Sequence, residues 1–73
     1  MEHPVIGFGL AYANQLIYCE AVMQEDAYDV LFNGRWVASI AYNEDWAWMQ
    51  SGGIILPKET IAPIGLKIES YYA

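Results

Sequence analysis

One stretch near the middle of the chain, Tyr28 to Tyr42 (YDVLFNGRWVASIAY), constrains the fold more than any other. Two runs rich in Val, Ile, Phe, Tyr and Trp flank the pair Asn33-Gly34. Both residues of this pair tolerate a positive φ angle, which allows the backbone to reverse its direction between two strands. The stretch therefore predicts a β-hairpin, around which the rest of the chain is organised.

The register of this hairpin depends on the length of its turn. A two-residue turn at Asn33-Gly34 gives one face of mixed character, made of Tyr28, Val30, Phe32, Arg35, Val37 and Ser39. A three-residue connection, with Gly34 as a left-handed bulge residue, gives a wholly apolar face made of Tyr28, Val30, Trp36, Ala38 and Ile40. Because a slip of one residue sends every side chain to the opposite face, burial favours the three-residue connection.

Further strands are predicted on both sides of the hairpin. The segment Gln15 to Gln24 fits both the helical and the strand period, and its β-branched and aromatic content favours a strand. After a polar turn at Asn43-Glu44-Asp45, the alternation of Trp46 to Ser51 predicts the next strand. If this turn also takes three residues, the facing pairs are Tyr42 with Trp46, Ile40 with Trp48, Ala41 with Ala47, and Ser39 with Met49.

The C-terminal segment changes its hydrophobic period from two to about 3.6. One helical stripe collects Ile61, Ile64, Gly65, Ile68, Tyr71 and Tyr72. Thr60 is predicted to be the N-cap, with Pro63 in the first turn and Pro57-Lys58-Glu59 as a turn or short helical lead-in. Gly65 lies within the stripe, so we expect the helix to approach the sheet closely at that residue.

Together these patterns predict an α+β fold, an antiparallel β-meander of about four strands with a C-terminal α-helix packed on one face. The expected strands are residues 15–24, 27–32, 35–42 and 46–51, within a single small domain spanning residues 14–73. Residues 1–13, with their apolar stretch Val5 to Ala13, are expected to form an N-terminal arm or an extra strand. In the alternative, Leu10 to Met23 is a helix and the order is α-β-β-β-α.

The charge and the length of the chain exclude several kinds of protein. The net charge is −6 over 73 residues, and the only basic side chains are Arg35, Lys58 and Lys67. This balance argues against binding to nucleic acids or to anionic membranes, because few cations can displace counterions, and it leaves a basic protein as a possible partner. No apolar run approaches the roughly 18 residues of a membrane span, and the single Cys19 forms no disulfide within the chain, so we expect a cytoplasmic protein.

No pattern in the sequence indicates catalysis, a metal site or a cofactor. His3 and Cys19 are far apart in the sequence, and no motif completes a nucleophilic set around them. The acidic residues near the turns lack the spacing and the central glycine of a calcium loop. The glycines match no phosphate-binding fingerprint. We therefore expect a protein that is not an enzyme, with no cofactor.

Eleven aromatic residues and a hydrophobic content of 56% exceed what a 73-residue monomer can cover. We therefore expect a protein-protein interaction module that acts as a homo-oligomer, most simply a homodimer. Its candidate interface residues are Phe8, Tyr12, Trp36, Trp46 and Trp48. The alternative function is the binding of a small molecule on a Trp-rich face of the sheet.

Several short patterns resemble those of small bacterial proteins of unknown function. They are Asn33-Gly34, Trp36-Val37-Ala38-x-Ile40, Trp48-x-Gln50-x-Gly52, Leu56-Pro57 and Ile64-Gly65-x-x-Ile68-Glu69. The resemblance covers about the last two thirds of the chain. It implies a common small fold, and it carries over no catalytic residue because the matching positions belong to turns, the core and helix packing.

Overall fold

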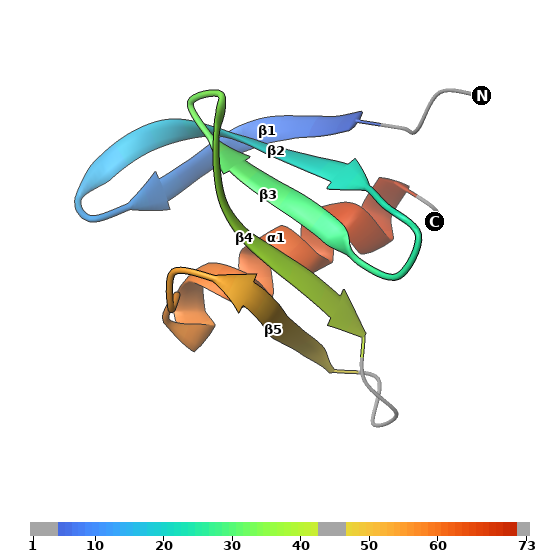
Figure 1. Cartoon of the computed structure of the whole chain (residues 1–73). Coiled ribbons are helices and arrows are strands. Elements are labelled where there is room, and N and C mark those ends of the chain that lie inside the picture. Colours follow the sequence, from blue (N-terminus) through green and yellow to red (C-terminus); the bar gives the residue numbers. More distant parts are fainter. Residues whose placement is uncertain (1–4, 43–46, 72–73) are drawn as a thin grey trace.

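The structure, a computed structural model, describes residues 5–42 and 47–71. In chain order its elements are β1 (Val5–Tyr12), β2 (Gln15–Met23), β3 (Tyr28–Phe32), β4 (Arg35–Tyr42), β5 (Trp48–Gly53) and α1 (Lys58–Tyr71) (Figure 1). The strands form one antiparallel sheet in the order β1-β2-β3-β4-β5, against which α1 packs. This confirms the predicted α+β meander, with five strands in place of four.

The additional strand comes from the apolar stretch at the start of the chain. β1 pairs with β2 from Val5 to Tyr12, through a turn in which Ala13 and Asn14 have φ angles of 51° and 62°. The alternative with a helix from Leu10 to Met23 is therefore wrong. The strand period dominates because Ile6 and Leu10 point into the core, while Gly7 on the outer face leaves room for the ring of Tyr18 from β2.

The central hairpin has the two-residue turn that Asn33-Gly34 favours and also buries an apolar face. Phe32 pairs with Arg35 across a two-residue turn in which Asn33 and Gly34 have φ angles of 51° and 85°, so the predicted three-residue connection is wrong. A bulge that leaves Val37 unpaired then shifts the register, and beyond it the pairs are Val30 with Ala38 and Tyr28 with Ile40. Tyr28, Val30, Ala38 and Ile40 thus share one face as predicted, but their pairing differs, because a three-residue connection would have paired Val30 with Trp36 and Tyr28 with Ala38.

Trp36 is on the opposite face from the one predicted. It lies between the turn and the bulge, where it pairs with Leu31, and its side chain is 53% exposed on the outer face of the sheet. There its indole Nε1 donates to Oδ1 of Asp29 at 3.4 Å, and the hydroxyl of Ser39 donates to the same oxygen at 2.8 Å.

The last strand is paired about two residues later than predicted. Tyr42 faces Trp48, Ile40 faces Gln50, Ala41 faces Met49 and Ser39 faces Gly52. The predicted partner Trp46 lies outside the described residues. A second bulge, between Ser39 and Ile40, carries the strand on to Gly53. The observed register places Trp48 beneath the helix, a contact that alternation within the strand cannot reveal.

The helix begins two residues before Thr60. The backbone amides of Thr60 and Ile61 donate to the carbonyl of Pro57, at 2.9 and 3.1 Å, so Pro57 precedes the first turn. Thr60 is a buried residue within that turn, and its prediction as the N-cap is wrong. The buried face of α1 holds Ile61, Ile64, Gly65 and Ile68 as predicted, whereas Tyr71 is 55% exposed and Tyr72 lies outside the described residues.

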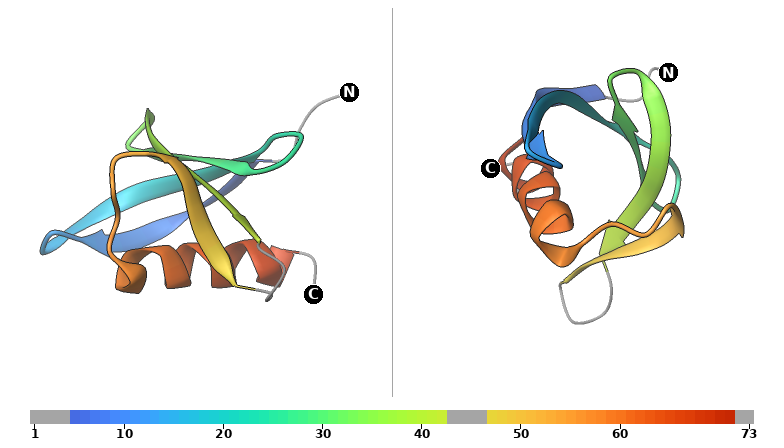
Figure 2. Two further views of the ribbon diagram at one scale, coloured as in Figure 1. Left: turned by 60° about the horizontal axis from the view of Figure 1, so that its bottom comes forward. Right: turned by 90° about the vertical axis from the view of Figure 1, so that its left-hand side faces the viewer.

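The sheet curves around the helix, and α1 contacts both of its edge strands, β1 and β5 (Figure 2). The core fills the space between them, with Cys19, Val30, Ile40, Ile64 and Ile68 almost entirely buried. This arrangement brings β5, the last strand, alongside the surface of the helix that follows it, and it forms a cleft there.

Candidate interaction site

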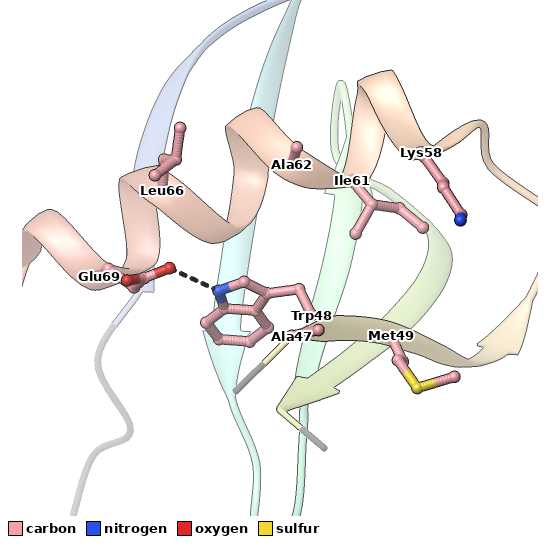
Figure 3. Close-up of a pocket in the computed structure, with 8 residues that line it drawn as sticks. All are labelled: Ala47, Trp48, Met49, Lys58, Ile61, Ala62, Leu66 and Glu69. Carbon is pink, nitrogen blue, oxygen red and sulfur yellow. Dashed lines mark hydrogen bonds between the residues drawn. The ribbon is translucent and has the colours of Figure 1, made fainter. Parts of the chain in front are cut away.

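A cleft of about 610 Å³ separates β5 from α1 (Figure 3). Its lining residues are Ala47, Trp48, Met49, Lys58, Ile61, Ala62, Leu66 and Glu69. We call this surface the β5–α1 cleft. Its middle is apolar, and its charged side chains stand at opposite ends of the helical wall.

The helical wall of the cleft is a single stripe of side chains. Lys58, Ala62, Leu66 and Glu69 are separated by four, four and three residues, which places them along one side of the helix. At a rise of about 1.5 Å per residue, the stripe from Lys58 to Glu69 is about 16 Å long. Leu66 lies about one turn before Glu69 with 65% of its surface exposed, and its side chain points away from β5, whereas that of Ile61 points toward β5 (Figure 3).

Trp48 connects the two walls of the cleft. Its ring packs against Tyr42 with the ring centres 4.1 Å apart, and against Tyr28 at 5.8 Å. The indole Nε1 of Trp48 donates to Oε2 of Glu69 on α1 at 2.9 Å. The ring also lies directly over Gly65, where a side chain would occupy the same space. Four contacts therefore fix Trp48, which gives the cleft one rigid end.

Glu69 is held in its charged form. Hydrogen bonds donated by Tyr42 and by Trp48 lower the pKa of the Glu69 carboxyl below its usual value. Burial of its ring and the hydrogen bond to Glu69 raise the pKa of Tyr42, so Tyr42 remains a donor at neutral pH. Lys58, at the other end of the stripe, forms no ion pair with a described residue. The cleft therefore has one negative and one positive end.

We expect Glu69 to contribute stability that depends on pH. A carboxyl whose pKa is lower in the folded state stabilises that state above its unfolded pKa, and this contribution is lost as the pH falls through the folded pKa. The urea midpoint of Glu69→Gln should fall below that of the wild type at pH 7, and the difference should shrink towards pH 2. Glu25→Gln, in the exposed turn after β2, is the control and should show a smaller difference. A difference for Glu69→Gln that grows on acidification would contradict the assignment.

The five interface residues predicted from the sequence do not form one surface. Phe8 and Tyr12 are half-buried against the core, where the ring of Tyr12 lies 5.1 Å from that of Phe32. Trp36 is on the outer face of the sheet, and Trp46 lies outside the described residues. Among these positions the structure brings only Trp48 to the cleft, and the predicted Trp-rich face is wrong because Trp36 and Trp48 lie on opposite sides of the sheet.

Sequence reasoning missed the helical wall of the cleft. Lys58, Ala62, Leu66 and Glu69 do show helical spacing in the sequence. That spacing is informative only once the helix is known to begin at Lys58, and the predicted N-cap at Thr60 left Lys58 outside it. Met49 was missed for a different reason, because its place at the cleft follows from the register of β5.

Cys19 is fully buried in the core. Its burial, and to a lesser extent the nearby charge of Glu20, raises the pKa of its thiol to about 12. Because the thiolate is the reactive form, we expect the folded chain to resist labelling by a thiol reagent at pH 8. The urea-unfolded chain should react at least a hundredfold faster. Rapid, stoichiometric labelling without denaturant would contradict this placement.

The described residues include no group of three or more His, Cys, Asp or Glu side chains that could hold a metal ion. His3 lies outside the described residues. No helix within residues 5–42 and 47–71 has both the length and the apolar character needed to cross a bilayer.

Searches against models of protein families, curated proteins and solved structures find no match. The resemblance to small bacterial proteins of unknown function stays a prediction.

Proposed function

We propose that the chain is a non-enzymatic protein-interaction module, and that it binds a partner protein through the β5–α1 cleft. The observation that carries this proposal is the concentration of exposed apolar side chains around the cleft. Met49 and Leu66, which line the cleft, are more than half exposed, and Ile55, which lines a neighbouring hollow together with Trp48 and Lys58, is 92% exposed. Large apolar side chains that gather in one region and are open to water are typical of sites that bind other proteins.

The spacing of the charges in the cleft favours a protein over a compact ligand. Lys58 and Glu69 lie about 16 Å apart along the helix, with only apolar side chains between them on the stripe. A partner that contacts both charges and the apolar middle must be extended. A protein element such as a helix or an extended segment meets this requirement.

A second candidate function is the binding of an apolar small molecule beside Trp48. The volume of the cleft, about 610 Å³, lies within the range of roughly 300–1,000 Å³ that is typical of ligand pockets. Such a ligand would contact Trp48, Met49 and Ile61 and leave Lys58 unused. Leu66 is then a peripheral residue, so its replacement separates the two functions.

The charge of the chain and its single cysteine bear on where it acts. Cys19 is a free thiol inside the core, which suits a reducing compartment, and we propose a cytoplasmic location on this ground. The net charge of −6 attracts basic proteins over long range and repels acidic ones. This long-range attraction raises the rate at which a partner associates, whereas the cleft determines where on the chain the partner binds.

Photo-crosslinking in cells that express the chain tests the proposal. A benzophenone amino acid at position 66 should form crosslinks to a protein, because Leu66 is 65% exposed at the rim of the cleft. The same amino acid at position 16 is the matched control, since Leu16 is 82% exposed on the outer face of the sheet. Crosslinks from position 66 that are absent from position 16 are expected. Crosslinks from position 16 alone, or from neither position, would overturn the proposal.

A further inference from the structure

We propose that the partner bound by the β5–α1 cleft is a second copy of this chain. In this dimer two clefts face each other across a two-fold axis, and the two α1 helices run antiparallel. The inference rests on the proposed function, because it uses the same cleft, and it adds the identity of the partner and the geometry of binding.

The charge pattern of the cleft is complementary to itself when it is reversed. Lys58 stands at one end of the helical stripe and Glu69 at the other, with the apolar residues Ala62 and Leu66 between them. Antiparallel helices bring Lys58 of each copy next to Glu69 of the other, so the two-fold axis forms the same attractive pair twice. Parallel helices would place Lys58 against Lys58 and Glu69 against Glu69, which repel.

The groups in the middle of the stripe fit the same symmetry. When Lys58 of one copy lies opposite Glu69 of the other, Leu66 of one stripe lies closest to Ala62 of the other. Leu66 is the exposed apolar side chain of the wall, and Ala62 is small, so the two helices can approach closely at that point. The buried face of α1, with Ile64 and Ile68, remains on the sheet and is not used twice.

Neighbouring charges on the helix do not cancel this pattern. Glu59 follows Lys58 directly, but it lines a separate hollow with Tyr12 and Asn14 at the β1–β2 turn. Lys67 does not line the cleft. Glu69 is kept ionised and in position by Tyr42 and Trp48, so its charge is available to a second copy.

Sedimentation equilibrium on the full chain at tens of micromolar tests the dimer. The wild type should have twice the monomer mass of 8.2 kDa. Leu66→Asp should be monomeric, because it places a charge in the apolar middle of the interface. Leu16→Asp, the same change on the outer face of the sheet, should remain dimeric. A monomeric wild type, or a Leu66→Asp variant that is still a dimer, would overturn the inference.

Exchanging the charges tests the antiparallel arrangement. Lys58→Glu alone and Glu69→Lys alone should each weaken the dimer at least about tenfold, since each creates two repulsive pairs. An equimolar mixture of the two variants should form a heterodimer, because every pair across the axis is attractive again. If the two variants associate no better together than separately, the antiparallel dimer is wrong.

Glu69→Lys also removes the acceptor for Trp48, so circular dichroism must first show that this variant folds. If it does not fold, Lys58→Glu is compared with Lys58→Met, which removes the charge without reversing it. Lys58→Glu should dissociate the dimer further than Lys58→Met, and equal effects would overturn the charge pairing.

The crosslinking experiment separates failure of this inference from failure of the proposed function. An adduct from position 66 with the mass of two chains supports the dimer. Adducts from position 66 that contain only other proteins would overturn the dimer and leave the interaction function in place. Absence of any adduct from position 66 would overturn both.

Discussion

Replacing Gly65 by Leu is expected to lower the free energy of unfolding by more than about 2 kcal/mol. A Cβ atom at this position would lie 2.6 Å from Cγ of Trp48, too close for any atom to occupy. Trp48 cannot easily move away, because Tyr28 and Tyr42 pack against its ring and Glu69 accepts its N–H. The cost should exceed the gain of about 1 kcal/mol in helix propensity when glycine is replaced.

Urea denaturation of the variant and the wild type measures this change. Lys67→Leu is the matched control, because Lys67 is an exposed residue two positions further along the same helix. It should change the free energy of unfolding by less than about 0.5 kcal/mol. A Gly65→Leu variant as stable as the wild type would mean that Trp48 does not cover Gly65, and the rigid end of the cleft would then be wrongly described.

The second large effect is expected at the end of β5, where Gly53→Ala should cost at least about 2 kcal/mol. Gly53 has a φ angle of 92°, which a residue with a Cβ atom rarely adopts. Its added Cβ would also lie 2.5 Å from Cα of Ala38 and 2.9 Å from the carbonyl carbon of Val37. These neighbours are backbone atoms of β4, so they cannot swing aside as a side chain could.

Gly52→Ala provides a control one residue away. A Cβ on Gly52 would meet no atom within 4 Å, so this variant should be close to the wild type in stability. The difference between the two urea midpoints isolates the positive φ angle and the contact with β4. Equal losses at the two positions would indicate that any change in this segment is disruptive, and they would contradict the specific role of Gly53.

The central hairpin shows how far local sequence patterns determine this sheet. The pair Asn33-Gly34 predicts the position of the reversal, and the apolar pattern predicts that Val30, Ala38 and Ile40 share the buried face. Neither pattern predicts the bulge at Val37 that makes the two compatible. Because the turn takes two residues and the bulge comes only after Trp36, this side chain lies on the outer face, opposite to the predicted one.

The buried face of α1 could be predicted from the sequence more completely than the cleft that α1 forms with β5. The period of Ile61, Ile64, Gly65 and Ile68 identifies the buried face, and the glycine within it indicates a close approach. The residue that approaches, Trp48, depends on the register between β4 and β5, a long-range property with no local signal. The candidate site could therefore be predicted only in part.

The aromatic residues near the N-terminus cover the core of their own chain, whereas the aromatic content of the sequence suggested that they form an interface with a second copy. Phe8 and Tyr12 cover the core as part of β1, which pairs within its own chain. The apolar stretch thus does not need a second subunit to pack against. Self-association is instead expected at the β5–α1 cleft, where exposed apolar side chains and opposite charges occur together.

The most direct measurement of that claim is a dilution series followed by ¹³C–¹H NMR of the methyl groups. The account predicts that the signals of Met49, Ile61 and Leu66 shift between millimolar and low micromolar concentrations, as the clefts separate. The signals of Leu16 and Val22, from the outer face of the sheet, should stay in place. Concentration-dependent shifts at Leu16 and Val22 with none at Leu66, or no shifts at all, would contradict assembly through the β5–α1 cleft.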